Sequence, residues 1–178
     1  MRRSSVVLVL VAGALSLAHA GVLASSSAQE LDLSALVAEA ERVCEVEVLD
    51  KTCALLPDGS LETRYQFATL TPLKGAVPSF QEVRMPGGEV AGRGLYVPGL
   101  PTWQRGDRIL LFLTREGKSK RWRLPVGLSA GVFQVHADSR GTRVFRRGAH
   151  AHGKAVSENH DYHQFLSEIL EEVGRQGR

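Results

Sequence analysis

The residues of this sequence best suited to metal chemistry are four histidines in its last third: His150, His152, His160 and His163. Two carboxylates lie among them, and imidazole and carboxylate groups are ligands for zinc, copper and nickel. The surrounding segment is polar and contains glycine, which is typical of a solvated linker that offers no preformed ligand geometry. We therefore treat these histidines as weak candidates for a metal site and expect no bound cofactor.

A Gly-x-Ser-x-Gly pattern places Ser129 between Gly127 and Gly131, which is the spacing of the nucleophile elbow of hydrolases. That elbow requires a strand, a tight turn and a helix within an α/β sheet. Here the flanking segments 124–126 and 132–133 are both apolar and favour a strand on each side. The sequence therefore predicts no catalytic residue, and we expect a protein that is not an enzyme.

The first twenty residues bear on the compartment in which any such chemistry would occur. Arg2 and Arg3 precede an apolar run at residues 6–17, and Ala-His-Ala at residues 18–20 resembles a cleavage site. This pattern predicts a Sec-type secretory signal peptide at residues 1–20, cleaved near Ala20, and a secreted or periplasmic protein. Its removal takes away two arginines and no acid, so the net charge of +3 falls close to neutral.

Cys44 and Cys53 are the only cysteines, and their chemistry depends on the path of the chain between them. An even number of cysteines in a secreted protein favours a disulfide. In one straight strand their Cα atoms would lie about 30 Å apart at roughly 3.3 Å per residue, whereas a disulfide needs about 7 Å or less. Their odd separation also points the side chains to opposite faces. An intramolecular disulfide thus requires a turn near Asp50 and Lys51, and buried free thiols or an intermolecular disulfide are the alternatives.

Two basic segments, residues 115–123 and 140–147, form a candidate site for a polyanion. Trp122 lies among the basic residues of segment 115–123, as a stacking aromatic does on a nucleic-acid surface. Alternation instead directs Trp122 and Leu124 toward the core and leaves Arg121 and Arg123 together on the other face. We expect no nucleic acid as a partner of a secreted protein, so the anion would be an envelope glycan or an acidic partner. The candidate residues are Lys118, Lys120, Arg121, Arg123, Arg143, Arg146 and Arg147.

The elements that must position these residues follow from hydrophobic periodicity. After a flexible leader at residues 21–30, helical spacing predicts a short helix over 33–42. Alternation and turn signals then predict a series of short strands, with a Pro-Asp-Gly-Ser turn at residues 57–60. We expect strands at 43–49, 61–73, 79–85, 95–97, 108–114, 121–126, 131–135 and 142–146. A polar linker at 148–160 precedes an amphipathic helix and tail at 161–178.

This order of elements predicts a mainly β fold. We expect one domain over residues 31–147, a small antiparallel barrel of the OB or netrin-like type, with an N-terminal and a C-terminal helix. No stretch after the signal peptide is long and apolar enough to cross a bilayer, so we expect no membrane span.

Four short sequence motifs in this region resemble those of a known protein family. They are Leu-Lys-Gly at 73–75, Pro-Gly-Gly at 86–88, Leu-Phe-Leu at 111–113 and Gly-Leu-x-x-Gly-x-Phe at 127–133. The chain resembles an uncharacterised family of small secreted bacterial β-barrel proteins. More distantly it is similar to the netrin-like module of tissue inhibitors of metalloproteinases, which is an OB-type barrel. The resemblance implies the barrel fold and the secreted location, and it implies no catalytic residue.

We therefore expect a secreted, non-catalytic protein that binds or modulates a partner protein at or outside the cell envelope. An extracellular protease is the partner class that the netrin-like resemblance implies. A module that binds a polyanion or an envelope glycan through the basic strands is the first alternative, and an enzyme is the second.

Overall fold

The computed structural model describes residues 31–147 and 157–177 of the chain. Along the chain, one α-helix precedes the β-strands and another follows them, and one short 3₁₀ helix precedes the seventh strand. The helices are α1 (Leu33–Glu39), η1 (Leu128–Gly131) and α2 (Tyr162–Gln176). The strands are β1 (Arg42–Leu55), β2 (Leu61–Lys74), β3 (Phe80–Pro86), β4 (Gly88–Val90), β5 (Arg93–Leu95), β6 (Arg108–Leu113), β7 (Val132–Asp138), β8 (Gly141–Arg147) and β9 (Ser157–Asp161).

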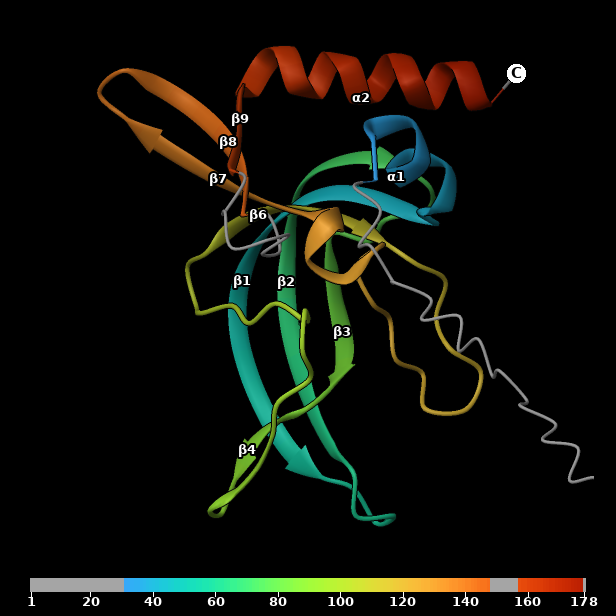
Figure 1. The fold of residues 1–178 in the computed structure, drawn as a ribbon, viewed down its shortest axis with the longest axis vertical. Coiled ribbons are helices and arrows are strands. Elements are labelled where there is room, and N and C mark those ends of the chain that lie inside the picture. Colours follow the sequence, from blue (N-terminus) through green and yellow to red (C-terminus); the bar gives the residue numbers. More distant parts are fainter. Residues whose placement is uncertain (1–30, 148–156, 178) are drawn as a thin grey trace, which may run out of the picture.

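Seven of these strands form one antiparallel sheet in the order β3-β2-β1-β6-β7-β8-β9, and β4 and β5 form a separate hairpin (Figure 1). The expected mainly β fold with a helix near each end is confirmed. The expected closure into a barrel is not found, because no pairing between β3 and β9 joins the two ends of the sheet among the described residues.

Both α-helices lie on the same side of the sheet, across the end that Figure 1 places at the top. Asp32 caps α1 by accepting a hydrogen bond from the backbone N–H of Ala35 at 2.8 Å. Asp161 caps α2 in the same way, through the N–H of Gln164. The apolar side of α2 buries Phe165 and Ile169 against the sheet, as its helical spacing predicts.

The sheet separates two apolar cores, and a strand period of two assigns neighbouring residues of one strand to different cores. The helix-side core contains Val43, Leu110 and Phe112 together with the helices. The loop-side core lies on the opposite face and contains Cys44, Val46, Tyr65 and Trp103, among others. β6 contributes to both cores, which explains why its sequence is almost entirely apolar.

β1 and β2 form a long hairpin that extends beyond the rest of the sheet (Figure 1). Their turn at residues 57–60 is the one predicted from sequence. β6 pairs with β1 only over Arg42–Glu47, while β2 pairs with β1 as far as Leu55. One of the register shifts in the β1–β2 ladder lies between Val48 and Asp50, and it changes the face to which later residues point.

Two sequence predictions of local structure are wrong. Residues 121–126 are not a strand, since only an isolated bridge between Leu113 and Pro125 forms there. The expected linker at 148–160 contains β9, which pairs with β8 along the sheet edge. β9 is held by polar contacts, including an ion pair between Arg146 and Glu158, rather than by an apolar face.

Candidate binding site

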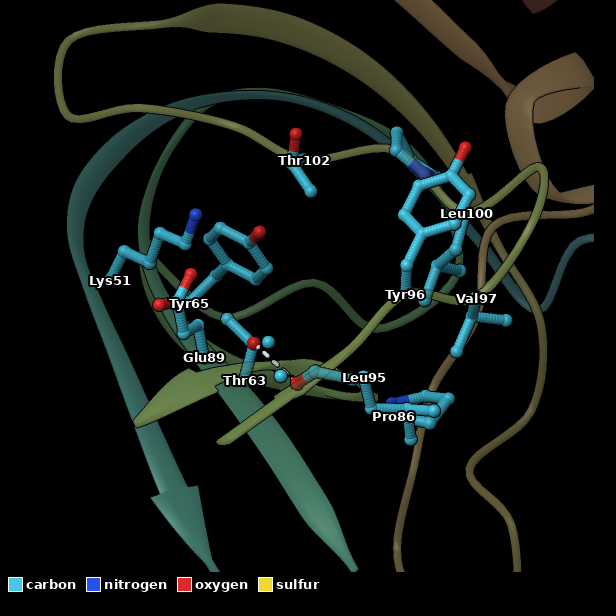
Figure 2. Close-up of a pocket in the computed structure, with 14 residues that line it drawn as sticks. Lys51, Thr63, Tyr65, Pro86, Glu89, Leu95, Tyr96, Val97, Leu100 and Thr102 are labelled. Carbon is cyan, nitrogen blue, oxygen red and sulfur yellow. Dashed lines mark hydrogen bonds between the residues drawn. The ribbon is translucent and has the colours of Figure 1, made fainter. Parts of the chain in front are cut away.

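An open pocket of about 410 Å³ lies on the loop side of the long β1–β2 hairpin, beneath the β4–β5 hairpin and the segment that follows it (Figure 2). We call it the hairpin pocket. Figure 2 shows Lys51 and Tyr65 on one side of it and Tyr96 and Leu100 on the other. Its lining is Lys51, Thr63, Tyr65, Pro86, Gly87, Gly88, Glu89, Gly94, Leu95, Tyr96, Val97, Leu100, Pro101 and Thr102.

The Pro-Gly-Gly motif at residues 86–88 positions the β4–β5 hairpin over the sheet. Gly87 and Gly88 have φ values of +94° and +121°, which side chains rarely adopt. A Cβ atom on Gly88 would lie 2.4 Å from Thr63 Oγ1 and 2.5 Å from Cys53 Sγ. The Thr63 hydroxyl donates a 2.7 Å hydrogen bond to the Gly87 carbonyl. The two glycines therefore let the backbone leave β3 and cross β1 and β2 at van der Waals distance.

Tyr65 forms the floor of the hairpin pocket and is held by aromatic packing. Its ring meets that of Trp103 edge-on with centroids 4.8 Å apart, and it stacks on Phe67 at 5.9 Å. Its hydroxyl accepts a hydrogen bond from the backbone N–H of Trp103. Burial raises the pKa of the Tyr65 phenol above its ordinary value, so the floor is uncharged at neutral pH.

The rim of the hairpin pocket exposes apolar side chains. Tyr96 is 77% exposed and Leu95 is 47% exposed, and both follow directly from the β4–β5 hairpin. Leu55 is 44% exposed and lies two residues beyond Cys53 on the same face of β1. Of the six large hydrophobic residues that are exposed in the described part of the chain, Leu95 and Tyr96 line the pocket and Leu55 lies on β1 outside its lining, whereas Leu70, Phe80 and Leu170 lie elsewhere. Apolar side chains gathered at one exposed place indicate a surface for a partner.

The hairpin pocket has two charged side chains in its lining, Lys51 and Glu89. Lys51 places its ammonium 5.9 Å from the Tyr65 ring centroid, and Lys51 and Glu89 form no ion pair within the described part of the chain. The lining contains no histidine, cysteine or serine, and the hydroxyl of Thr63 is engaged in its hydrogen bond to the Gly87 carbonyl. What it offers is an aromatic floor, an apolar rim and one cation without a carboxylate partner.

The histidine candidates are only partly placed by the structure. His160 lies on β9, where its ring stacks on Phe165 with centroids 4.5 Å apart and contacts the helix-side core. His163 lies exposed in the first turn of α2. His150 and His152 fall outside the described residues. Across residues 31–147 and 157–177, no group of three or more histidine, cysteine or acidic residues could hold a metal ion.

Ser129 lies in η1, which leads into β7. The preceding segment is not a regular strand, and Gly127 and Leu128 both have positive φ values. A nucleophile elbow has the order strand, turn, helix within an α/β sheet, and this segment has a 3₁₀ turn followed by an antiparallel strand. The surroundings of Ser129 thus differ from that motif.

Cys44 and Cys53 are both free thiols in the structure. β1 runs without a turn through Asp50 and Lys51, so the chain path that an intramolecular disulfide requires is not present. The expectation that the two side chains face opposite sides is wrong, because the register shift near Val48 returns Cys53 to the loop side. Burial raises the pKa of the Cys44 thiol to about 11.

The basic candidates do not form one surface. Ion pairs join Lys120 to Asp58 at 2.5 Å, Arg121 to Glu116 at 2.7 Å and Arg123 to Glu41 at 2.9 Å. Arg143 bonds to the side chain of Asn159, and Arg146 pairs with Glu158 on β9. Lys118 is exposed in the 115–123 loop, and the side chain of Arg147 lies outside the described residues. In Figure 1 this loop and the β7–β8 hairpin project from opposite sides of the sheet.

The predicted alternation around Trp122 is also wrong. Arg123 is buried, because it reaches Glu41 and the carbonyl of Thr114, while Arg121 is exposed. Trp122 is half-buried and donates from Nε1 to Glu62 at 3.0 Å, with the Lys120 ammonium 5.0 Å from its ring centroid. The tryptophan of the loop-side core is instead Trp103.

Sequence reasoning missed the hairpin pocket. The available signals were the glycine pair after β3 and an exposed tyrosine in a segment rich in glycine and proline. Neither signal says that the segment folds back over β1 and β2.

Comparison with family models, with curated proteins and with solved structures finds no match to this chain. Within the described helices, none is long and apolar enough to cross a membrane.

Proposed function

We propose that this chain is a secreted or periplasmic, non-catalytic binding protein that recognises a partner protein through the hairpin pocket. The observation that carries the proposal is the exposure of Leu95 and Tyr96 in a pocket whose floor is the aromatic ring of Tyr65. Exposed aromatic and aliphatic side chains at a concave place are typical of the energetic centres of protein interfaces. The partner acts at or outside the cell envelope, because the N-terminal residues predict export.

The chemistry of the surface supports a protein partner over a polyanion. Among the basic residues predicted from sequence, Lys120, Arg121, Arg123 and Arg146 each pair with a carboxylate of this chain. A cation that already has a carboxylate partner must give it up before it binds an external anion. The apolar rim of the hairpin pocket has no such competitor.

The proposal is tested by affinity capture with residues 21–178 as bait, applied to the culture supernatant and periplasm of the source cells. The Tyr96→Ala bait removes the most exposed aromatic of the rim. Truncation of a central interface tyrosine costs about 2 kcal/mol or more, so we expect at least about a thirtyfold loss of affinity for a captured partner. The matched control is Phe80→Ala, which removes an aromatic that is 72% exposed on β3.

A partner that the wild-type and Phe80→Ala baits retain and the Tyr96→Ala bait loses supports the proposal. Equal capture by all three baits would place the partner on another surface and refute it. Because Tyr96 is exposed, its replacement should change the free energy of unfolding by no more than about 0.5 kcal/mol. Thermal unfolding of each bait checks this.

A further inference from the structure

The far part of β1 is an exposed sheet edge beside the hairpin pocket. β6 leaves β1 at Val48, whose N–H donates to the Asp107 carbonyl and whose carbonyl accepts from the Gly106 N–H. From Asp50 to Leu55, β1 pairs with β2 on one side. On its other side no backbone hydrogen bond forms within residues 31–147 and 157–177. The sheet therefore lacks one neighbouring strand, in line with β6, over this part of β1.

The hydrogen-bond register shows which backbone groups of β1 face the open edge. The Leu56 N–H donates to Ser60, and residues of an antiparallel ladder alternate between bonding to the partner and pointing away from it. Even-numbered residues of this part of β1 therefore bond to β2. Lys51, Cys53 and Leu55 each direct an N–H and a carbonyl outward, over a length of about 14 Å at roughly 3.4 Å per residue.

The other two edges of the sheet are more strongly protected than this one. At the outer edge of β3, Pro86 has no N–H and the Arg84 carbonyl accepts from the Arg123 N–H. β9 at the opposite end is polar along its whole length, with the sequence Ser-Glu-Asn-His-Asp. Residues 51–55 read Lys-Thr-Cys-Ala-Leu and contain a single charge. Proteins normally block exposed edges with proline, charge or a covering segment, so an open edge indicates a place for a further strand.

We propose that an extended segment of the partner polypeptide adds to the sheet as a strand antiparallel to β1 at Lys51–Leu55, beneath the β4–β5 hairpin. This inference rests on the proposed function and specifies how the partner is recognised. Main-chain hydrogen bonds give a strand-addition complex its affinity, and alternate side chains give it specificity. The antiparallel direction continues that of β6.

The side chains beside the edge define the chemistry of the segment. Lys51, Cys53 and Leu55 point to the loop side, since they lie opposite Tyr65, Thr63 and Leu61 of β2. Lys51 lacks a carboxylate partner among the described residues, and Leu55 is exposed. An antiparallel segment with an acidic residue opposite Lys51 and an apolar residue opposite Leu55, four positions earlier, complements both.

A second copy of this chain fits the edge less well than a partner segment does. A two-fold antiparallel pairing centred on Cys53 would set Lys51 against Leu55 at both ends. It would also bring two β4–β5 hairpins together on the same face, and Figure 1 shows the tip of this hairpin projecting past β1 on the side away from β2. A single extended segment meets neither obstacle.

The test uses a displayed library of random twelve-residue peptides panned against residues 21–178. Selected peptides are synthesised and their dissociation constants measured by fluorescence anisotropy. Leu55→Pro removes an outward N–H and leaves the β1–β2 ladder unchanged, since proline is tolerated where the N–H points away from the sheet. Glu82→Pro makes the same change at the outer edge of β3 and is the matched control. On the ligand, N-methyl groups are placed at alternate amides in each of the two possible phases.

We expect selected peptides to have an apolar residue four positions before an acidic one. They should bind about tenfold more weakly to Leu55→Pro, since one hydrogen bond is lost and one carbonyl of the peptide is left without its donor. One N-methyl phase should weaken binding by a similar factor and the other should not. Equal binding to wild type and Leu55→Pro, or equal effects of the two phases, overturns strand addition. If Tyr96→Ala still abolishes binding in that case, the proposed function stands and only its mode is wrong. If the library yields no binder, strand addition is overturned, and the capture experiment alone decides the proposed function.

Discussion

Gly88→Ala should destabilise the protein through contact with the sheet as well as through backbone strain. A residue with a side chain at such a φ costs about 1–3 kcal/mol, and φ at Gly88 is +121°. The added Cβ would also lie 2.4 Å from Thr63 Oγ1 and 2.5 Å from Cys53 Sγ. Overpacking of this kind costs about 1–3 kcal/mol more. The Thr63 hydroxyl cannot rotate away without losing its hydrogen bond to the Gly87 carbonyl.

The matched control for this prediction is Gly141→Ala. Gly141 has a φ of +126°, and a Cβ there would meet nothing within 4 Å. It therefore has the strain without the contact. Urea unfolding of both variants, followed by fluorescence and circular dichroism, should give a free energy of unfolding about 1–3 kcal/mol lower for Gly88→Ala than for Gly141→Ala. Adding Cys53→Ala to Gly88→Ala should recover part of the difference.

Equal losses of stability in the two glycine variants would show that the β4–β5 hairpin does not lie against Cys53 and Thr63. The hairpin pocket would then lose the segment that lies over β1 and β2, and the placement of Leu95 and Tyr96 at this pocket would fail. A loss at Gly88 that Cys53→Ala leaves unchanged would restrict the contact to Thr63.

Four further measurements check other parts of the structure. In native protein at pH 8, an aromatic disulfide reagent should label Cys53 before Cys44, because burial raises the pKa of the Cys44 thiol to about 11. If the protein unfolded in urea without reductant titrates with two thiols, the two cysteines form no disulfide. Because the pKa of the Cys44 thiol is higher in the folded protein than in the unfolded chain, where it is about 9, its contribution to stability is fully present below about pH 9. Roughly 2–3 kcal/mol should be lost as the pH rises to about 11, and Cys44→Ala, which has no thiol to titrate, should lack this component. Tyr162→Phe should lower the free energy of unfolding by about 1–3 kcal/mol, since its hydroxyl donates to the fully buried Glu45 at 2.8 Å; Tyr96→Phe, at an exposed site, should change it little. Amide hydrogen exchange should alternate along β1, fast at Lys51, Cys53 and Leu55 and slow at Thr52 and Ala54; uniform protection would mean that the edge is covered.

The regular elements were predictable because their signals are local. Alternation located the first half of β1 and the whole of β2 and β3, the apolar run located β6, and helical spacing located α2. The Pro-Asp-Gly-Ser turn between β1 and β2 was predicted by its residue types alone. These segments bury one face or both, and burial is what hydrophobic periodicity reports.

The errors arise where distant residues decide the local structure. Arg123 is buried because Glu41, far away in sequence, reaches it, so alternation misjudged segment 121–126. β9 has no apolar face, since it is a polar edge strand held by Arg143 and Arg146 of β8. The faces of the two cysteines were misjudged because a single register shift near Val48 reverses the parity that an odd separation implies.

The hairpin pocket depends on two such exceptions acting at one level of the sheet. The register shift near Val48 brings Lys51, Cys53 and Leu55 to the loop side, and without it these side chains would face away from the β4–β5 hairpin. The glycine pair after β3 lets that hairpin cross at the height of Cys53. β6 pairs with β1 only as far as Glu47, so it is absent beside Cys53. The β4–β5 hairpin therefore covers one face of β1 there, while the edge of β1 stays open. The irregular part of β1 is therefore the place at which we expect a partner to bind.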